Sequence, residues 1–352
     1  MSPELREATG APHKSMRLVV RSDLSLAEAT TRLLSGIEAR WPGEVPHPAE
    51  FAVSATPCGP GMWINGHDRA DLASVLHQLT EALDVAGFSD ATLDHLVETS
   101  PELVSAPRPT PFAECRFTVR LGADGAVADA DRHAAVDDAA RWCLSLPGTV
   151  FMLAGMLSTT VSRPRAAEVL AVNGLAETTG STGLVRPMSR LVVEGNGIFR
   201  MATLSFRSGY LSVAEGTTQP ADFDWRRSVD AVTSALRDVG DWATSGFVKR
   251  GGAWSSTADR TFTDWPPPPR PIPRRGRLQR DLEQHGLLDA FGVMLRGATD
   301  APLPSDGRWQ AEPVGDRVFV RHSDPAAWYA ETTPNEATLA EAREQLGPLF
   351  AP

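Results

Sequence analysis

The chain has 352 residues, of which 42% are hydrophobic and 22% charged, and its formal net charge is −10. This length predicts two domains, and the apolar content is sufficient for a sizeable core. The acidic charge repels phosphate backbones, so it argues against nucleic acid as a partner and favours a basic partner surface. Only two of the basic residues are lysines, and this bias is typical of a GC-rich bacterial genome.

The compartment expected from the sequence is the cytoplasm. The first residues lack the apolar segment of a signal peptide, and no apolar run is long enough to cross a bilayer. The three cysteines, Cys58, Cys115 and Cys143, are widely spaced and form no CxxC pair. This spacing argues against zinc-ribbon and thioredoxin-like folds and predicts three reduced thiols.

A first α+β block is expected over 15–105, after a loose tail over 1–14. Strands are predicted where β-branched residues alternate with polar ones, and helices where apolar residues recur at three-to-four spacing. Ser25 and Glu28 have the spacing of a capping box at a helix start. In chain order, we predict a strand over 16–23, a helix over 25–41, strands over 50–57 and 62–64, and a helix over 69–87.

The glycine-rich stretch 57–68, PCGPGMWINGHD, raises the question of a ligand loop. Its Asn-Gly dipeptide is typical of a tight turn, and Asp68 stands at the expected N-cap of the next helix. It lacks the glycine spacing of a phosphate loop, and acidic residues at the helix start would repel an anion. We interpret the stretch as structural, while His67 beside Trp63 keeps a binding role open.

A second and longer α+β block is expected over 112–262. Its element order resembles that of the first block, which favours two related halves. The predicted fold class is therefore α+β, with mixed or antiparallel sheets and packed amphipathic helices. The expected elements are strands over 113–122, 190–195, 197–206 and 209–216, helices over 129–146 and 224–250, and an apolar segment over 148–162.

The last part of the chain is expected to be an extension of the second block. Four consecutive prolines within 263–277 predict a stiff linker, or else a docking motif for an aromatic-grooved domain. A helix over 278–295, a hairpin over 308–322 that turns at Gly315-Asp316, and a helix over 335–350 complete the segment 278–352. This ending resembles the ends of some bacterial immunity proteins, although it contains no diagnostic residue.

Few residues have spacings that point to catalysis. His133 and Asp137 lie four residues apart on the helix predicted over 129–146 and could share a metal, but we favour a solvated acidic helix face as the explanation and expect no metal. Cys58 follows a proline in a glycine-rich loop, and a thiol enzyme would need a base such as His67 or His133. The sequence patterns of zinc proteases, EF-hands and nucleophile elbows do not occur. We expect no cofactor.

Tryptophan outnumbers tyrosine by nine to two. Tryptophans in loop-like segments either form a binding face or attach the loops to the body of the protein. Those in loop-like segments are Trp254, Trp265, Trp309 and Trp328. The candidate binding residues are Trp63, His67, Asp68, Trp265, Trp309 and Trp328.

Three classes of function remain open. The favoured one is a non-enzymatic protein-binding module, such as an immunity protein, an adaptor or a secretion chaperone, that recognises a basic partner. The second is an enzyme whose site is assembled from scattered residues, namely Cys58, His67, Asp68 and His133. The third is a structural subunit of a larger bacterial assembly, in which the proline-rich segment would form an arm.

Overall fold

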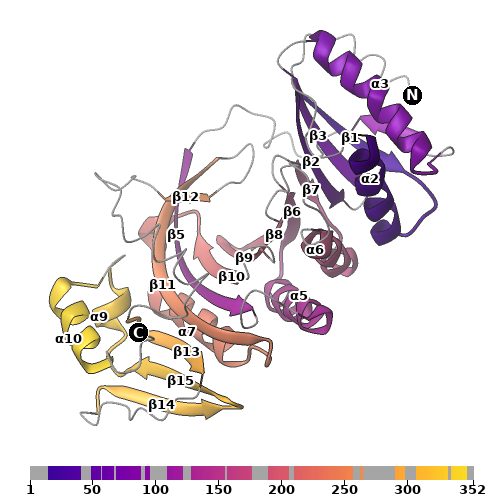
Figure 1. Cartoon of the computed structure of the whole chain (residues 1–352). Coiled ribbons are helices and arrows are strands. Elements are labelled where there is room, and N and C mark those ends of the chain that lie inside the picture. Colours follow the sequence, from indigo (N-terminus) through magenta and orange to yellow (C-terminus); the bar gives the residue numbers. More distant parts are fainter. Residues whose placement is uncertain are drawn as a thin grey trace. The chain divides into compact units, whose positions relative to one another are not determined.

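The structure is a computed structural model in which the chain forms two compact units (Figure 1). The first unit comprises Met1–Pro107 and Val150–Leu191, and the second comprises Arg108–Thr149 and Val192–Pro352. The segment from Val150 to Leu191, which the sequence leaves within the block 112–262, thus groups with the first unit. The structure describes residues 15–40, 49–56, 58–66, 69–88, 92–95, 109–121, 128–154, 157–176, 189–205, 210–256, 262–264, 290–297, 307–331 and 334–346.

The first unit contains an antiparallel sheet with the strand order β2-β3-β1-β4. Its elements are β1 (Ser15–Arg21), α2 (Leu26–Arg40), β2 (Ala49–Thr56), β3 (Gly59–Gly66), α3 (Arg69–Val85) and β4 (Thr92–His95). The predicted strands and helices of this block are confirmed, and β4 is an addition that the sequence analysis missed. Strand β1 lies in the middle because it pairs with both β3 and β4.

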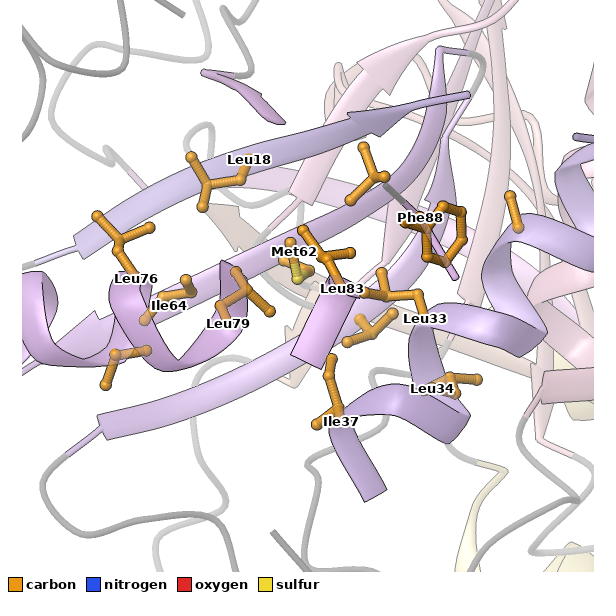
Figure 2. Packing of buried hydrophobic residues seen from close by; sticks show 14 residues of the cluster. Leu18, Leu33, Leu34, Ile37, Met62, Ile64, Leu76, Leu79, Leu83 and Phe88 are labelled. Carbon is orange, nitrogen blue, oxygen red and sulfur yellow. The ribbon is translucent and has the colours of Figure 1, made fainter. Parts of the chain in front are cut away.

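Helices α2 and α3 pack against each other and against the sheet, and a hydrocarbon core fills the space between them (Figure 2). Burying each such side chain contributes about 1.5–3 kcal/mol, an amount that draws the apolar stripes of both helices onto the sheet. The core residues are Leu18, Val20, Ala29, Leu33, Leu34, Ile37, Val53, Met62, Ile64, Val75, Leu76, Leu79, Leu83 and Phe88.

Local signals set the helix ends. The N–H of Glu28 donates to the Ser25 hydroxyl at 3.3 Å, so one half of the predicted capping box forms, while the Glu28 carboxylate accepts from Arg32 instead. Helix α3 ends at Val85, and Gly87, whose φ of 76° suits glycine, follows its C-terminal end. The N–H of Phe88 reaches the carbonyl of Leu83, and that of Gly87 reaches the carbonyl of Asp84, which is a Schellman motif.

The glycine-rich stretch forms a β-hairpin. Thr56 pairs with Gly59, so Cys58 lies in the turn between β2 and β3. The prediction that the Asn65-Gly66 dipeptide forms a turn is wrong. The dipeptide is the end of β3, where Asn65 pairs with Glu50. Pairing with strands on both sides outweighs the local turn preference. Asp68 lies outside the described residues, and its role as an N-cap stays a prediction.

The segment that returns to the first unit contributes β6 (Thr149–Ala154), β7 (Leu157–Thr160) and α6 (Arg163–Ala176). Helix α6 was not predicted; its Pro164 lies in the first turn, where proline is tolerated. The side chain of Asn173 is buried and forms two hydrogen bonds with the backbone of Ala55. Its Oδ1 accepts from the Ala55 N–H at 2.6 Å and its Nδ2 donates to the Ala55 carbonyl at 3.0 Å. Asn173 thereby satisfies groups that edge strand β2 would otherwise leave unpaired.

The second unit repeats the topology of the first. Its strands β9, β10, β5 and β11 are neighbours in that order, as β2, β3, β1 and β4 are in the first unit, and the helices occupy the same places in the chain. The prediction of an α+β fold with two related halves is therefore confirmed. The elements are β5 (Pro109–Leu121), α5 (Asp129–Leu144), β9 (Ile198–Ser205), β10 (Tyr210–Thr217), α7 (Trp225–Arg237) and β11 (Ala243–Ser256).

Two loops define the ends of elements in this unit. Strand β8 (Ser189–Gly195) leads into β9 through Asn196 and Gly197, which both have positive φ, as a type I′ hairpin requires. A short helix, η1 (Pro220–Asp222), precedes α7, whose N-cap Asp224 accepts from the Arg227 N–H.

The single helix predicted over 224–250 is wrong. Helix α7 ends at Arg237, and β11 begins at Ala243. Strand β5 offers β11 a pairing partner along nearly its whole length, and this non-local pairing outweighs the helical spacing of the apolar residues.

A C-terminal extension lengthens this sheet in the order β11-β13-β15-β14. The hairpin with a turn at Gly315 and the closing helix are confirmed. The helix predicted over 278–295 is wrong at its C-terminal end, because strand β13 begins at Val293. Thr263 and Asp264, the first two residues of the linker predicted over 263–277, belong to β12, and the remainder of that segment lies outside the described residues. The elements are β12 (Phe262–Asp264), which pairs with β11, then β13 (Val293–Gly297), β14 (Trp309–Val314), β15 (Arg317–His322), α9 (Ala326–Tyr329) and α10 (Glu336–Leu346).

None of the helices within the described ranges has both the length and the apolar character needed to cross a membrane.

Candidate functional site

The C-terminal extension contains a pocket of about 290 Å³, which we call the C-terminal pocket. The hairpin β14–β15 places Trp309 directly opposite His322, α9 adds Trp328, and α10 adds polar side chains one turn apart. The lining residues are Arg308, Trp309, His322, Ser323, Asp324, Ala327, Trp328, Thr338, Glu341, Ala342 and Gln345.

Three rings form the aromatic wall of the pocket. The rings of Trp309 and His322 meet edge to face with centroids 4.8 Å apart, and those of Trp309 and Trp328 do so at 5.9 Å. Both tryptophans are largely buried, with 5% and 4% of their surface exposed. Two of the candidate binding residues are thus brought together, although as a packed wall and not as an exposed face. Edge-to-face contacts of this kind fix the position of each ring.

A chain of hydrogen bonds places a carboxylate in the lining of the pocket. Trp309 Nε1 donates to Gln345 Oε1 at 2.8 Å, and Gln345 Nε2 donates to Glu341 Oε1 at 3.3 Å. The same Glu341 oxygen accepts from the guanidinium of Arg308. The side chains of Arg308 and Glu341 are about half exposed, at 52% and 47%. The indole therefore orients the Gln345 amide, and the amide holds the Glu341 carboxylate next to solvent.

The histidine of the pocket is oriented by the main chain. His322 Nδ1 lies 3.1 Å from the main-chain nitrogen of Asp324 and 3.1 Å from its carbonyl oxygen, so the main chain of Asp324 positions the imidazole ring. The Asp324 carboxylate accepts from the N–H of Ala326 at 3.0 Å and thereby holds the start of α9. These bonds fix the ring in place. They do not pair the imidazole with a carboxylate, as in the histidine base of a Ser-His-Asp triad.

The structure describes one further candidate binding residue. Trp63 belongs to β3, where it pairs in register with Arg17 and Ala52. Trp265, His67 and Asp68 lie outside the described residues.

The candidate metal pair lies on the surface of α5, where His133 and Asp137 are both exposed. No group of three or more metal-ligating side chains occurs in the part of the chain that the structure describes. His133 belongs to the second unit, whereas Cys58, its suggested partner in a thiol enzyme, belongs to the first.

The three cysteines differ in environment. Cys58 is exposed at the β2–β3 turn, whereas Cys115 and Cys143 are buried, and all three are free thiols. Burial raises the pKa of the Cys115 and Cys143 thiols well above the usual value, outweighing the opposing effects of Arg250 and Arg200. Because the thiolate is the nucleophile, neither buried cysteine is activated at neutral pH.

The sequence analysis missed His322, Glu341, Gln345 and Arg308. One signal could have found the histidine: Trp309 and His322 are equally distant from the Gly315-Asp316 turn, and a two-residue turn makes such positions face each other. The residues of α10 carry no comparable signal, because nothing in a polar helical sequence tells which turn will face a pocket.

The comparisons with known proteins leave the family open. No protein-family model and no curated protein matches the chain. Among solved structures, a Pseudomonas aeruginosa T6SS protein matches with 11% identity and a TM-score of 0.36, over 68% of this chain and 74% of its own. A bacterial light-regulated adenylyl cyclase matches with 10% identity and a TM-score of 0.23, over 96% of this chain and 99% of its own. At these TM-scores neither likeness supports a conclusion about fold or function.

Proposed function

We propose that the chain is a non-enzymatic protein-binding module that recognises a basic partner surface through the C-terminal pocket. The observation that carries the proposal is the geometry of the pocket: an aromatic wall on which hydrogen bonds hold the carboxylate of Glu341 at the edge of solvent. This arrangement lies in the extension, outside the duplicated α+β topology. Added segments of this kind distinguish proteins that share a scaffold.

The size of the pocket supports recognition of a side chain and not of a whole small molecule. Its volume is about 290 Å³. Sites for small-molecule ligands usually enclose about 300–1,000 Å³. A pocket at the lower limit of that range suits one anchoring side chain in the centre of a larger interface.

The charge of the chain supports a basic partner. The net charge of −10 attracts a basic surface over the whole approach, and such steering mainly raises the rate of association. An immunity protein, an adaptor and a secretion chaperone would all use this kind of recognition.

The test starts from a partner captured from the native host with the full chain as bait. Association and dissociation rates of the purified pair are then measured as the salt concentration rises and the Debye length falls from about 30 Å at 0.01 M to about 3 Å at 1 M. We expect the association rate to fall by about tenfold or more while the dissociation rate changes less.

An association rate that ignores salt would contradict the electrostatic part of the proposal. A chemical turnover by the chain that is lost in His133→Ala with the fold retained would contradict the non-enzymatic part and favour the enzyme hypothesis.

A further inference from the structure

We infer that the C-terminal pocket binds an arginine side chain of the partner. In the free protein, Arg308 occupies the position on Glu341 that this arginine occupies in the complex. The inference rests on the proposed function and names the group that the pocket recognises. The ion pair between Arg308 and Glu341 is the contact that the partner would exchange.

The Arg308–Glu341 pair is suited to exchange because it lies next to solvent. Both side chains are about half exposed, and exposed ion pairs of this kind are weak. Glu341 stays in position when Arg308 leaves, because Gln345 Nε2 still donates to its Oε1 and Trp309 still holds Gln345. Arg308 also keeps its backbone position, since its carbonyl accepts from the N–H of Ser323 at 2.7 Å. The exchange therefore replaces one guanidinium by another on a carboxylate that is fixed beforehand.

The chemistry of the pocket favours a guanidinium over an ammonium group. A guanidinium is flat, packs against aromatic rings and meets a carboxylate with two parallel donors, whereas an ammonium is a compact, strongly hydrated charge. The lining of the pocket contains both partners that a guanidinium prefers, a carboxylate and two indole rings, of which 5% and 4% of the surface is exposed to contact. The chain uses arginine in the same way elsewhere: the guanidinium of Arg200 lies 4.6 Å from the ring centre of Trp142, and that of Arg226 lies 4.5 Å from the ring centre of Trp225.

The balance of charge in the pocket supports an incoming cation. Glu341 and Asp324 are acidic, Arg308 is basic, and the chain around them is acidic overall. With Arg308 displaced to solvent, an entering guanidinium restores the charge balance of the pocket. An entering carboxylate would instead lie beside Glu341 and Asp324 and would be repelled.

The experiment is a titration of the full, ¹⁵N-labelled chain with N-acetyl-arginine-N-methylamide, followed by NMR of the indole N–H signals. The Trp309→Phe variant assigns the reporter signal. N-acetyl-citrulline-N-methylamide is the neutral control of nearly the same shape, and the lysine analogue tests the preference for guanidinium. Glu341→Gln removes the carboxylate charge that the guanidinium would meet, and Glu344→Gln, at an exposed position of the same helix, is its matched control.

We expect the arginine probe to shift the Trp309 indole signal with a saturable dependence, and the citrulline probe to bind about tenfold more weakly or worse. Glu341→Gln should weaken binding by about tenfold, whereas Glu344→Gln should leave it unchanged. Arg308→Ala should tighten binding by about three- to tenfold, because it removes the internal competitor from the bound position.

Equal binding of the arginine and citrulline probes, or no shift at all, would overturn the inference. Weaker binding in Arg308→Ala would also overturn it, since that result would make Arg308 part of the binding site and not a placeholder. If the captured partner still associates in a salt-dependent way while the arginine probe fails to bind, the proposed function stands and the inference alone fails.

Discussion

The two copies of the α+β topology bury different chemistry beneath their helices. In the first unit, one row of paired residues across β2, β3 and β1 consists of Val53, Met62 and Leu18, which are all part of the hydrocarbon core (Figure 2). In the second unit, a row across β9, β10, β5 and β11 consists of Arg200, Glu215, Cys115 and Arg250. The same strand order therefore accommodates a hydrocarbon core alone or, in the second unit, one ionic row beside buried hydrocarbon rows such as Ala202, Val213, Phe117 and Val248.

The ionic row is held by specific partners. Glu215 is only 1% exposed, and its carboxylate accepts from Arg200 Nε at 2.8 Å, with Arg227 3.9 Å away. Arg200 also donates to the carbonyl of Trp142 and to the hydroxyl of Ser145 at the C-terminal end of α5. A cation at a helix C-terminus is favourable. Arg200 therefore joins α5 to the sheet by hydrogen bonds, which have a fixed direction, as well as by packing. The core residues of the first unit are apolar, so their side chains hold α2 and α3 by packing and not by hydrogen bonds.

The comparison teaches what each layer tolerates. Apolar side chains of similar volume can replace one another in a hydrocarbon core at little cost, because the attraction has no direction. A buried charge tolerates no loss of its partner, because the remaining charge is then left without solvent or counterion. We therefore expect the second unit to be the more sensitive of the two to single substitutions in its sheet.

The sharpest test of this difference is Glu215→Ala. It leaves Arg200 beneath α5 with its carboxylate partner gone, and breaking a buried pair in this way costs about 3–5 kcal/mol. We expect this loss in the free energy of unfolding from urea denaturation of the second unit. The matched control is Glu312→Ala, which breaks the exposed Arg237–Glu312 pair of the same unit and should cost about 0–1 kcal/mol.

A double replacement separates the need for charge from the need for volume. Glu215→Leu combined with Arg200→Met turns the ionic row into one like that of the first unit. Since apolar residues of similar volume often replace a buried ion pair without loss, the double variant should be more stable than Glu215→Ala alone. A Glu215→Ala loss no larger than that of Glu312→Ala would contradict the distinction between the two layers.

The sequence predicted most elements of both units, because their signals are local. Apolar spacing predicted α2 and α3, and the turn residues Gly315-Asp316 predicted the β14–β15 hairpin. The prediction failed where pairing with a distant strand decided the outcome, as in β11, or where an element has little amphipathic pattern, as in α6.

The ionic row and the C-terminal pocket could not be predicted from the sequence. Arg200 and Glu215 read as ordinary polar positions of a meander, and only the register of β9 against β10 places them opposite each other. Trp309 and Trp328 were recognised as candidates, but their burial and the polar network behind them depend on how α10 packs, which no spacing reveals.

The first unit also has a buried polar side chain, Asn173, which lies at the edge of the sheet and not beneath α2 and α3. Asn173→Ala removes both hydrogen bonds to the backbone of Ala55. Because each unsatisfied backbone group costs about 1–3 kcal/mol, and an edge strand can regain water, we expect a loss of about 2 kcal/mol in the free energy of unfolding of the first unit.

The control for Asn173→Ala is Glu168→Ala, at an exposed position of the same helix, which should change stability by less than about 0.5 kcal/mol. Hydrogen exchange at the Ala55 amide gives a local reading, since its protection should fall in Asn173→Ala and not in the control. Unchanged protection would show that the Asn173 side chain does not hold the edge of β2.

The last test uses the buried thiols, which only the second unit has. Burial raises the pKa of Cys143 above its usual value, so the folded chain keeps this proton when the unfolded chain has lost it. Stability linked to the thiol is thus fully present below the unfolded pKa of about 8.5 and falls by about 1.4 kcal/mol per pH unit above it. Urea unfolding of the reduced protein at about pH 8, 9 and 10 should therefore show the gap between the natural chain and Cys143→Ala shrinking as pH rises. A stability difference that stays constant over this range would mean that the thiol ionises in the folded protein as it does in the unfolded chain. It would place the Cys143 thiol nearer to solvent than its burial indicates.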